Sequence, residues 1–546
     1  MKNIIANIIW FVSTTMNDLK YKLAINEKKK TQKKILFNII SKNKNSEFGK
    51  KYNFSNIKNI NDWQEKLPIT QYEDYIEYIE LIKKGKQNIL SQDRVLILEP
   101  TSGSSGPSKL IPYTSGLQKE FQKAIDPWLF DLFTKIPRLL LGKHYWSISP
   151  VSKIKQTDST VLIGFASDEE YLGPIARFVA NQIKPVPSIV KEIQNIDYFK
   201  YVTLLFLLKT KNLVFVSIWH PSFLSLLLEK LPLWHKELVE DIRNGTLNPP
   251  NISDSNIKKK LLEYIKPDKL RARELEKIFS DNIKAYKKIW PKLKVISSWQ
   301  NTDKLFPDVL LQEKGLISTE AIISFPLLNK SGKNLAINSH FFEFKEKEGS
   351  KILLAHQLEK NKYYEVIVTS INGFCRYKIG DTIKVVGFDK KCPLIEFVGR
   401  SHKVSDIRGE KLNEIHVNKI LKNIYKKYNI IPSFAMLAPV IENNKIFYAL
   451  FLELEDNKNI DLLKNIKQQL ESNLRENFHY NNCRNLEQLK DLKIFLIREN
   501  NLVAQKIYID ISHRLGQNLG DIKPVSLSNY TNWLEHFPGE VLNIKL

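Results

Sequence analysis

The chain has 546 residues, of which 43% are hydrophobic and 11% aromatic, and its formal net charge is +24. This composition fits a globular protein of two or more domains and excludes an intrinsically disordered chain. The lysines are spread along the whole chain without an arginine-rich block or a zinc-finger pattern, so we expect no nucleic-acid partner despite the positive charge.

The targeting signals of the sequence are weak. The N-terminal stretch 1–16 is apolar but is interrupted by asparagines, and no small-residue cleavage site follows it, so we expect a first helix that packs on the core. The most apolar later stretch, 201–219, contains Lys209 and Lys211, so we expect no membrane span. The three cysteines are widely spaced, which argues against a disulfide framework or a zinc site. We therefore expect a cytoplasmic monomer.

The hydrophobic patterns predict an α/β fold. Residues 1 to about 90 have helical patterns, and after them short apolar strands alternate with helical stretches, as the helix predicted at 223–242 illustrates. The strands predicted in this region are 95–98, 145–150, 212–219 and 294–299. Alternation of this kind is typical of an α/β core.

The pattern changes twice in the second half of the chain. Residues 340–398 contain several short strand patterns, which predict a β-rich subdomain. From residue 400 onward, helices predicted at 413–428 and 460–477 are interspersed with strands, which predicts a compact α+β domain. We therefore expect a large N-terminal domain over 1–399 and a smaller, mobile C-terminal domain over 400–546.

A loop rich in hydroxyl groups and glycine, TSGSSGPSK at 101–109, follows the first predicted strand. We expect it to connect that strand to a helix. Gly103 and Gly106 permit a positive φ, which lets several backbone N–H groups point at one anion. Further donors are the hydroxyl groups of Thr101, Ser102, Ser104 and Ser105 and the ammonium group of Lys109. The loop favours polyphosphate binding over a plain surface turn, although Leu110 after the lysine excludes a Walker loop.

Two later acidic residues fit the same chemistry. Asp381 lies in a predicted Gly-Asp turn at the edge of a strand, where a carboxylate can accept two hydrogen bonds from ribose hydroxyls. Glu320, in the stretch STEAIISFPL at 318–327, suits a Mg²⁺ ion near a triphosphate. Taken singly, an ordinary turn acid and a helix N-terminal residue remain good alternatives. Trp299, at the end of a predicted strand, could contact a ligand or belong to the core.

The order of these motifs resembles that of the acyl-adenylate-forming enzymes. Within that superfamily the chain is similar, nearly end to end, to the GH3 acyl-acid amido synthetases, specifically their bacterial-type members. The stretches that match include TQKKILFNIISKNKNSEFGKKYNF, LPITQYEDYIEYIE, IWPKLKVISSW, CRYKIGDTIKVVGF and NFHYNNCRNLEQLK.

The resemblance implies a ligase that uses ATP and Mg²⁺ in two steps. A small carboxylic acid would attack the α-phosphate of ATP to give acyl-AMP and pyrophosphate, and the amine of an amino acid would then take the acyl group. By this resemblance Glu320 and Lys523 are the catalytic residues, and Glu320 also contacts the metal. The implied nucleotide and phosphate contacts are Thr101, Ser102, Gly103, Ser104, Ser105, Gly106, Lys109, Ser318, Thr319, Asp381 and Arg400.

Two alternatives stay open at this point. The acceptor could be the thiol of coenzyme A or of a carrier protein rather than an amine. A basic binding protein without catalytic activity is the other possibility, and the retained loop, Asp381 and Lys523 argue against it. The sequence does not reveal the acid or the acceptor.

Overall fold

The computed structural model describes most of the chain. The described residues are 2–101, 109–147, 155–156, 161–164, 179, 182–218, 221–250, 255–299, 305–347, 349, 351–400, 404–442, 445–454, 459–485, 488–498, 503–515, 517 and 522–542. Within these ranges the side chains of 155, 156, 221, 222, 226, 255, 256, 400 and 478 are not described. The expected phosphate contacts Ser102, Gly103, Ser104, Ser105 and Gly106 lie outside the described residues.

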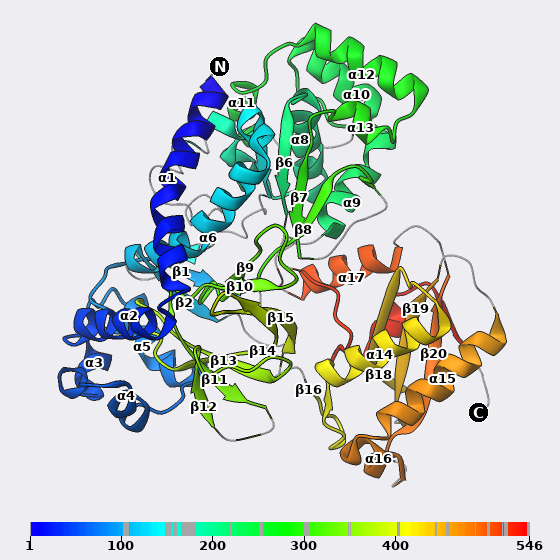
Figure 1. Ribbon diagram of the computed structural model, residues 1–546. Helices are drawn as coiled ribbons and strands as arrows, with labels where there is room; N and C mark the ends of the chain where they lie inside the picture. The colour runs from blue at the N-terminus through cyan, green and yellow to red at the C-terminus, as the bar shows by residue number, and fades with distance from the viewer. Residues whose placement is uncertain are drawn as a thin grey trace.

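Helices form the beginning of the chain, as the patterns predict. The first helix packs lengthwise on α6 (Ser115–Lys135), and its Trp10 is fully buried against Phe133 of that helix (Figure 1). Ser46 and Asn59 accept backbone N–H groups at the starts of α3 and α4, which are N-cap contacts that fix where a helix begins. These helices are α1 (Lys2–Ala24), α2 (Lys28–Asn43), α3 (Glu47–Lys51), α4 (Ile60–Lys66) and α5 (Ile76–Lys83), with 3-10 turns at Phe54–Asn56 and Tyr72–Tyr75.

A parallel sheet of four strands forms the α/β core, in the order β3 (Lys143–Trp146), β6 (Leu213–Ser217), β7 (Val295–Ser298) and β8 (Leu310–Glu313). One face packs on α6, and the other packs on helices that include the largely apolar α8 (Figure 1). The helix predicted at 223–242 is two helices that meet at Lys230. The helices of this part are α8 (Ile196–Lys209), α9 (Pro221–Glu229), α10 (Leu231–Asn244), α11 (Ser255–Leu262), α12 (Lys269–Asp281) and α13 (Tyr286–Ile289), with 3-10 turns at Pro137–Leu141 and Ser188–Glu192.

Two further sheets complete the large domain. The predicted β-rich region forms a seven-stranded sheet in the order β12-β11-β13-β14-β15-β10-β9, and a four-stranded sheet has the order β2-β1-β5-β4. The strands of the larger sheet are β9 (Ser324–Phe325), β10 (Lys333–Leu335), β11 (Phe341–Glu346), β12 (Ile352–Leu354), β13 (Tyr363–Thr369), β14 (Tyr377–Asp389) and β15 (Cys392–Arg400). Those of the smaller sheet are β1 (Val95–Pro100), β2 (Leu110–Thr114), β4 (Lys155–Gln156) and β5 (Leu162–Ile163).

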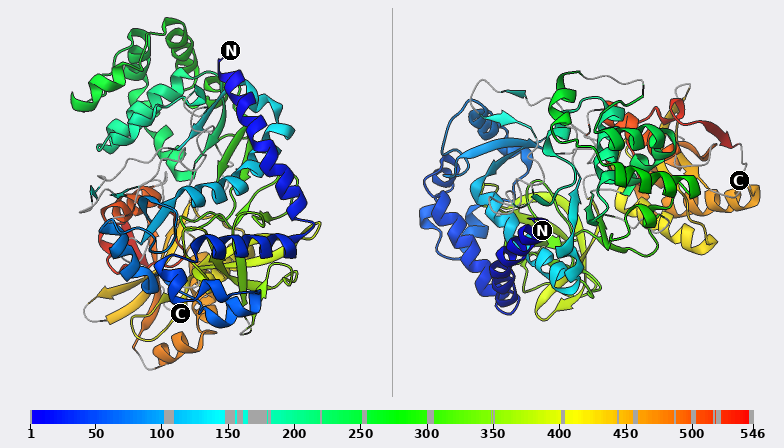
Figure 2. Two further views of the ribbon diagram at one scale, coloured as in Figure 1. Left: turned by 90° about the vertical axis from the view of Figure 1, so that its left-hand side faces the viewer. Right: turned by 90° about the horizontal axis from the view of Figure 1, so that it is seen from above.

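The C-terminal domain is a second α+β unit with its own sheet, in the order β18-β19-β20-β21. Its two faces are covered by separate apolar clusters, one with α14 and α15 and one with α17 and Trp533. In Figure 2 this domain lies beside the large domain. Its elements are β16 (Val404–Ser405), β17 (Leu412–Asn413), α14 (Glu414–Tyr428), β18 (Phe434–Glu442), β19 (Lys445–Glu453), α15 (Ile460–Leu474), α16 (Phe478–Asn485), β20 (Lys490–Ile497), α17 (Val503–Arg514), a 3-10 turn at Trp533–Glu535 and β21 (Gly539–Leu542).

All three cysteines are buried and none forms a disulfide. Burial raises the pKa of each thiol, that of Cys392 to about 12. Cys375 and Cys392 belong to the core of the large domain, and Cys483 belongs to the C-terminal domain. Among the helices of the described ranges, none combines the length and the apolar character that crossing a bilayer requires.

Candidate active site

The carboxyl ends of the parallel strands bring together side chains from distant parts of the sequence. β6 ends at Ser217, β7 at Ser298 and β8 at Glu313, side by side in one sheet. In open α/β sheets, ligands bind outside this edge. Trp299 and Lys314 directly follow β7 and β8, so the topology places both at the edge where a ligand is expected.

Lys314 is a buried cation at this edge. Its side chain crosses from β8 toward β6, where its Nζ donates a hydrogen bond to Ser217 Oγ at 2.6 Å. The same Nζ lies 5.3 Å from the ring centre of Trp128 and 5.9 Å from that of Trp146. Only 8% of the residue is exposed. Aromatic faces stabilise a cation that has lost part of its water.

Other polar donors lie on the same face of the sheet. Gln312 precedes Lys314 by two residues, and its Oε1 accepts a hydrogen bond from Trp128 Nε1 at 2.7 Å. Among the buried side-chain groups of the described residues that have no hydrogen-bond partner, three lie together here: Gln312 Nε2, Ser297 Oγ and Trp146 Nε1. Since buried donors in a folded protein normally have partners, these groups mark a place where polar atoms of a ligand can bind.

A small pocket opens beside Lys314. Apolar side chains of α6 line one wall and residues after β8 line the other, among them Ile125, Trp128, Ile317, Ile322 and Phe325. The pocket therefore joins an apolar lining to the buried ammonium group. An apolar pocket with a few fixed polar groups is the usual form of a small-molecule site, although the empty volume here, about 230 Å³ with the adjoining solvent, suits only part of a ligand.

Glu320 lies at the tip of a tight hairpin that follows β8. The hairpin is closed by the hydrogen bonds Ile323 N–H to Leu316 C=O and Ser318 N–H to Ala321 C=O, both 2.9 Å. Glu320 is 7% exposed, and Tyr377 Oη lies 3.4 Å from its Oε1. Burial, and then the nearby Glu320 carboxylate, raise the pKa of the Tyr377 hydroxyl well above its usual value. The expected helix N-terminal alternative for Glu320 is wrong, because no helix begins here.

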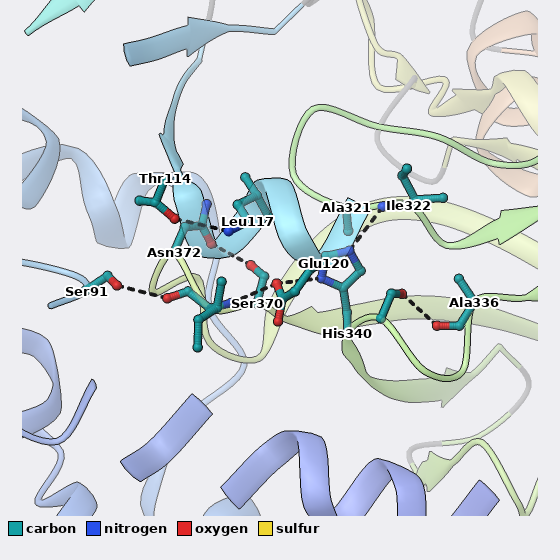
Figure 3. Close-up of polar contacts among 12 residues, drawn as sticks. Ser91, Thr114, Leu117, Glu120, Ala321, Ile322, Ala336, His340, Ser370 and Asn372 are labelled. Atoms are coloured by element: carbon teal, nitrogen blue, oxygen red, sulfur yellow. Dashed lines mark hydrogen bonds and ion pairs between the residues drawn. The ribbon is translucent and has the colours of Figure 1, made fainter. Parts of the chain in front are cut away.

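A buried histidine and glutamate hold this hairpin in place (Figure 3). His340 Nε2 accepts the backbone N–H of Ile322 at 3.3 Å, so the proton of the neutral ring is on Nδ1, which donates to Glu120 Oε2 at 3.0 Å. The same carboxylate oxygen accepts the N–H of Ile371 at 3.0 Å. His340 is fully buried and Glu120 is 4% exposed. These hydrogen bonds fix the position of the hairpin relative to α6, which carries Glu120.

The ends of the predicted phosphate loop are described, although its centre is not. The loop joins two antiparallel strands, β1 and β2, so the expectation that a helix follows it is wrong. The residues LIPYT continue the sheet, and α6 begins only at Ser115, capped by Thr114. Thr101 N–H donates to the carbonyl of Lys109 at 2.7 Å, and Lys109 Nζ lies 5.5 Å from the ring centre of Tyr72. The structure therefore fixes where the loop leaves the sheet and where it returns.

Asp381 lies inside strand β14 rather than in a turn, which corrects the sequence expectation. Gly380 has φ +88 at an irregular point of the β13–β14 ladder, so the Gly-Asp pair forms a bulge. Asp381 is 1% exposed and pairs across the ladder with Arg400, the last residue of β15. The side chain of Arg400 lies outside the described residues. Asp381 and Arg400 nevertheless share one register position at the end of the large domain.

Lys523 is the point at which the C-terminal domain contacts the site. It lies on the segment beside β18, where Leu437 N–H donates to Ser526 C=O at 3.0 Å and Tyr508 Oη donates to Lys523 C=O at 3.0 Å. Its Nζ lies over the ring of Trp299, which follows β7 of the large domain. A lysine that is remote in sequence therefore reaches the carboxyl ends of the parallel strands.

Comparison with known proteins decides the family. Models of the GH3 family N-terminal domain, central domain and C-terminal domain match residues 20–302, 334–400 and 415–531. The chain belongs to the GH3 family. The family and the enzyme class expected from the sequence, a ligase, are both confirmed.

Relatives and solved structures that are similar to this GH3 protein support the same family assignment. A probable indole-3-acetic acid-amido synthetase of Arabidopsis thaliana is 25% identical over 72% of this chain and 70% of its own. The structure of the GH3.15 acyl acid amido synthetase has a TM-score of 0.78 at 21% identity and covers 97% of both chains. The same enzyme in complex with 2,4-DB gives 0.77 at 20% identity, over 93% of this chain and 92% of that one. The predicted mixed α/β fold with a large and a smaller domain is confirmed.

Sequence reasoning missed three residues of this candidate site: Glu120, His340 and Lys314. Glu120 and His340 are 220 residues apart, so no local pattern links them. Lys314 left a faint signal, because Gln312 and Lys314 are polar residues spaced by two after an apolar run. In a strand that spacing places both on one face, and polar groups on a core-facing side often belong to a site.

Proposed function

We propose that this GH3 protein is an ATP-dependent acyl-acid amido synthetase. It joins a small carboxylic acid to an amine, with an amino acid as the acceptor, through an acyl-AMP intermediate. Named activities of relatives support the ligase reaction, and the contact of Lys523 with Trp299 is the observation that carries the proposal. That contact brings a cation from the C-terminal domain to the strand ends of the large domain.

A cation at this edge is what the first half-reaction requires. Attack of a carboxylate on the α-phosphate of ATP moves charge onto the departing pyrophosphate, and a fixed positive group lowers that barrier. Phosphoryl and nucleotidyl transfer depend mainly on positioning and on neutralising charge. Lys523 supplies the charge, and Lys109, at the end of the phosphate loop, supplies another.

The remaining proposed contacts to ATP follow from the family resemblance of the motifs. Ser102 to Gly106, with Thr101 and Lys109 at the ends of the loop, bind the phosphates. Asp381 binds the ribose, with Arg400 across the ladder from it. Ser318, Thr319 and Glu320 lie at the turn that faces the α-phosphate.

A Mg²⁺ ion would depend on one carboxylate of the protein. No three histidine, cysteine or acidic side chains gather as a ligand set in the described part of the chain. Mg²⁺ commonly binds through one or two carboxylates, substrate phosphates and water, so a single buried Glu320 fits such an ion. The ion would neutralise phosphate charge.

The acid binds beside Lys314. The apolar lining from α6 and the hairpin holds its hydrocarbon body, and the ammonium group of Lys314 and the amide of Gln312 lie where oxygen atoms can accept hydrogen bonds. Two tryptophans near the ammonium suit a flat, aromatic acid.

The test is ATP–pyrophosphate exchange with a panel of acids. We expect exchange above background with at least one small aromatic or aliphatic acid, and none without acid. Mass spectrometry of reactions that contain the active acid, mixed amino acids and coenzyme A then identifies the acceptor. An amide product supports the proposal, and a thioester supports an acyl-CoA ligase instead. Salt-sensitive binding to DNA without any turnover of ATP would contradict both.

The proposed setting is the cytoplasm. Three buried cysteines without a disulfide suit a reducing compartment. The nucleotide substrate is available there as well. Fractionation of cells with an antibody to the native chain would test this location.

A further inference from the structure

The outer face of helix α1 is apolar and exposed. The inner face packs on α6 through buried residues that include Trp10 and Tyr21. Seven large apolar residues on the other side are 45% to 70% exposed: Ile5, Ile8, Ile9, Val12, Met16, Leu19 and Leu23. We call these seven residues the α1 ridge. In the left view of Figure 2, α1 lies in front of α6 with no other element over it.

The spacing of the α1 ridge is that of a helix-pairing seam. Six of its members, Ile5, Ile9, Val12, Met16, Leu19 and Leu23, follow one another at alternating steps of four and three residues. This is the heptad spacing by which one helix packs lengthwise against another. A helix that is apolar on both sides is normally buried on both sides. Within the described ranges, no element covers the second side of α1 as its composition predicts.

The area of the α1 ridge fits a protein interface. Seven half-exposed side chains present roughly 700 Å² of mostly apolar surface, above the few hundred Å² that monomeric proteins commonly expose in one patch. A stable interface buries about 800 Å² on each partner. One such helix face on each of two molecules is therefore close to what a stable dimer needs.

The charges around the α1 ridge favour a helix over a lipid surface. Helices that lie in a membrane interface carry Lys and Arg along their polar flanks. α1 carries no charged residue from Asn3 to Asn17, and the positions beside the seam include Ser13 and Thr15. Uncharged small flanks allow a second helix to approach without burying a charge.

We infer that two copies of this chain associate through their α1 ridges. The contact is isologous, so the same seam serves both partners and no other protein is needed. It lies on the outer side of α1 and leaves the proposed ATP site free. Dimerisation is therefore separate from catalysis, and the expectation of a monomer made from the sequence is replaced by this proposal.

The net charge predicts an unusual salt dependence for this dimer. Each copy carries a formal charge of +24, so two copies repel one another at long range. Salt screens that repulsion but does not weaken contacts between apolar side chains. The dimer should therefore be tighter at ~0.5 M salt than at ~0.05 M salt. Attachment of a basic protein to an anionic lipid surface depends on salt in the opposite direction.

The experiment is analytical ultracentrifugation of the full chain over a range of concentrations. We expect a reversible monomer–dimer equilibrium in the wild type. The variant V12E/M16E places carboxylates near the middle of the seam, at positions 62% and 60% exposed, and we expect its dissociation constant to rise more than about tenfold. The matched control L233E/L270E makes the same charge change at Leu233 and Leu270, which are 68% and 78% exposed elsewhere, and should dimerise like the wild type.

Several outcomes would overturn the inference. A wild-type chain that stays monomeric at ~100 µM, well above typical dissociation constants, contradicts it. So does a V12E/M16E variant that dimerises as tightly as the control. If the monomer instead binds vesicles that contain phosphatidylserine, and V12E/M16E abolishes that binding, the α1 ridge is a lipid-binding face. Circular dichroism and unchanged ATP–pyrophosphate exchange confirm that both variants are folded.

Discussion

The two chain segments that carry Glu320 and Lys523 are held in different ways. The hairpin with Glu320 is closed by its own backbone hydrogen bonds and by the buried His340–Glu120 pair. The segment with Lys523 is hydrogen-bonded within its own domain and touches the large domain at the ring of Trp299, while Lys506 of α17 forms an exposed ion pair with Glu229 at 3.9 Å. Exposed ion pairs contribute little to stability.

This difference suggests a division of labour between a preorganised and a movable part. Buried hydrogen bonds hold the hairpin of Glu320 in one position, as the proposed mechanism requires of a group that acts on bound substrate. Weak contacts across the domain boundary allow Lys523 to approach for one step and to leave for the next. Changes on the Lys523 side should therefore alter rate without altering folding, and changes on the hairpin side should alter both.

The largest expected effect is that of Lys523→Ala. Loss of the cation should slow ATP–pyrophosphate exchange by about 10² to 10³-fold, while the thermal unfolding temperature should change little because Lys523 is only partly buried. Lys506→Ala is the matched control, since it removes a lysine of the same domain at the surface. A Lys523→Ala protein that exchanges at wild-type speed would exclude Lys523 from the mechanism.

A smaller effect is expected for Asp381→Ala. The buried carboxylate should contribute a hydrogen bond to the ribose, so its removal should weaken ATP binding by about tenfold. Isothermal titration of ATP measures this directly, and Asp381→Asn, which keeps the shape, should weaken binding less. Unchanged affinity in Asp381→Ala would make Asp381 a structural residue of the β14 bulge.

The two hydrogen bonds of the His340 ring, one to Ile322 and one to Glu120, can be tested separately with two variants. His340→Gln should still accept the Ile322 N–H, whereas His340→Asn should still donate to Glu120 but leave that N–H without an acceptor. If His340 positions the hairpin, His340→Asn should have the lower kcat in exchange, by a few-fold, and also the lower unfolding temperature, because it leaves a buried N–H unpaired. Equal kcat values in the two variants would reduce the pair to a packing role.

The smallest effect concerns α6, which carries Glu120. Asp126 of α6 accepts a hydrogen bond from Asn17 of α1 at 2.6 Å, and burial raises its pKa to about 7. The native chain therefore keeps a proton that the unfolded chain releases above pH 4, so the free energy of unfolding falls as pH rises from about 4 to 7. Asp126→Asn can still accept the hydrogen bond from Asn17, and it cannot ionise, so the loss of stability with rising pH should disappear. We expect its unfolding temperature to exceed that of the wild type by about 2 to 4 °C at pH 8 and by less at pH 5.

The sequence predicted the order of helices and strands better than it predicted strand register and the contacts between domains. Strands such as Val295–Ser298 and helices such as Glu414–Tyr428 follow from local hydrophobic patterns. The register that pairs Asp381 with Arg400 follows from a bulge at Gly380, which no local pattern reveals. The contact between Lys523 and Trp299 joins two domains and lies beyond any local rule.

The site residues show the same limit. Motif order named Glu320 and Lys523 as site residues, and the structure places Lys523 over Trp299 and Glu320 in the hairpin that follows β8. The helix expected after the phosphate loop was wrong because LIPYT pairs with β1 before α6 begins. Burial of Glu120 and His340 depends on the packing of four separate elements, so it could be found only in three dimensions.

The buried cysteines have a practical consequence for following the domains. Because all three thiols are enclosed and their protonated forms are favoured, the native chain should be inert toward maleimide reagents at neutral pH. One cysteine introduced on the surface of each domain would then carry a fluorescent donor and acceptor without removal of any native residue. Energy transfer between the two dyes would report, in real time, whether the C-terminal domain rotates between adenylation and amide formation.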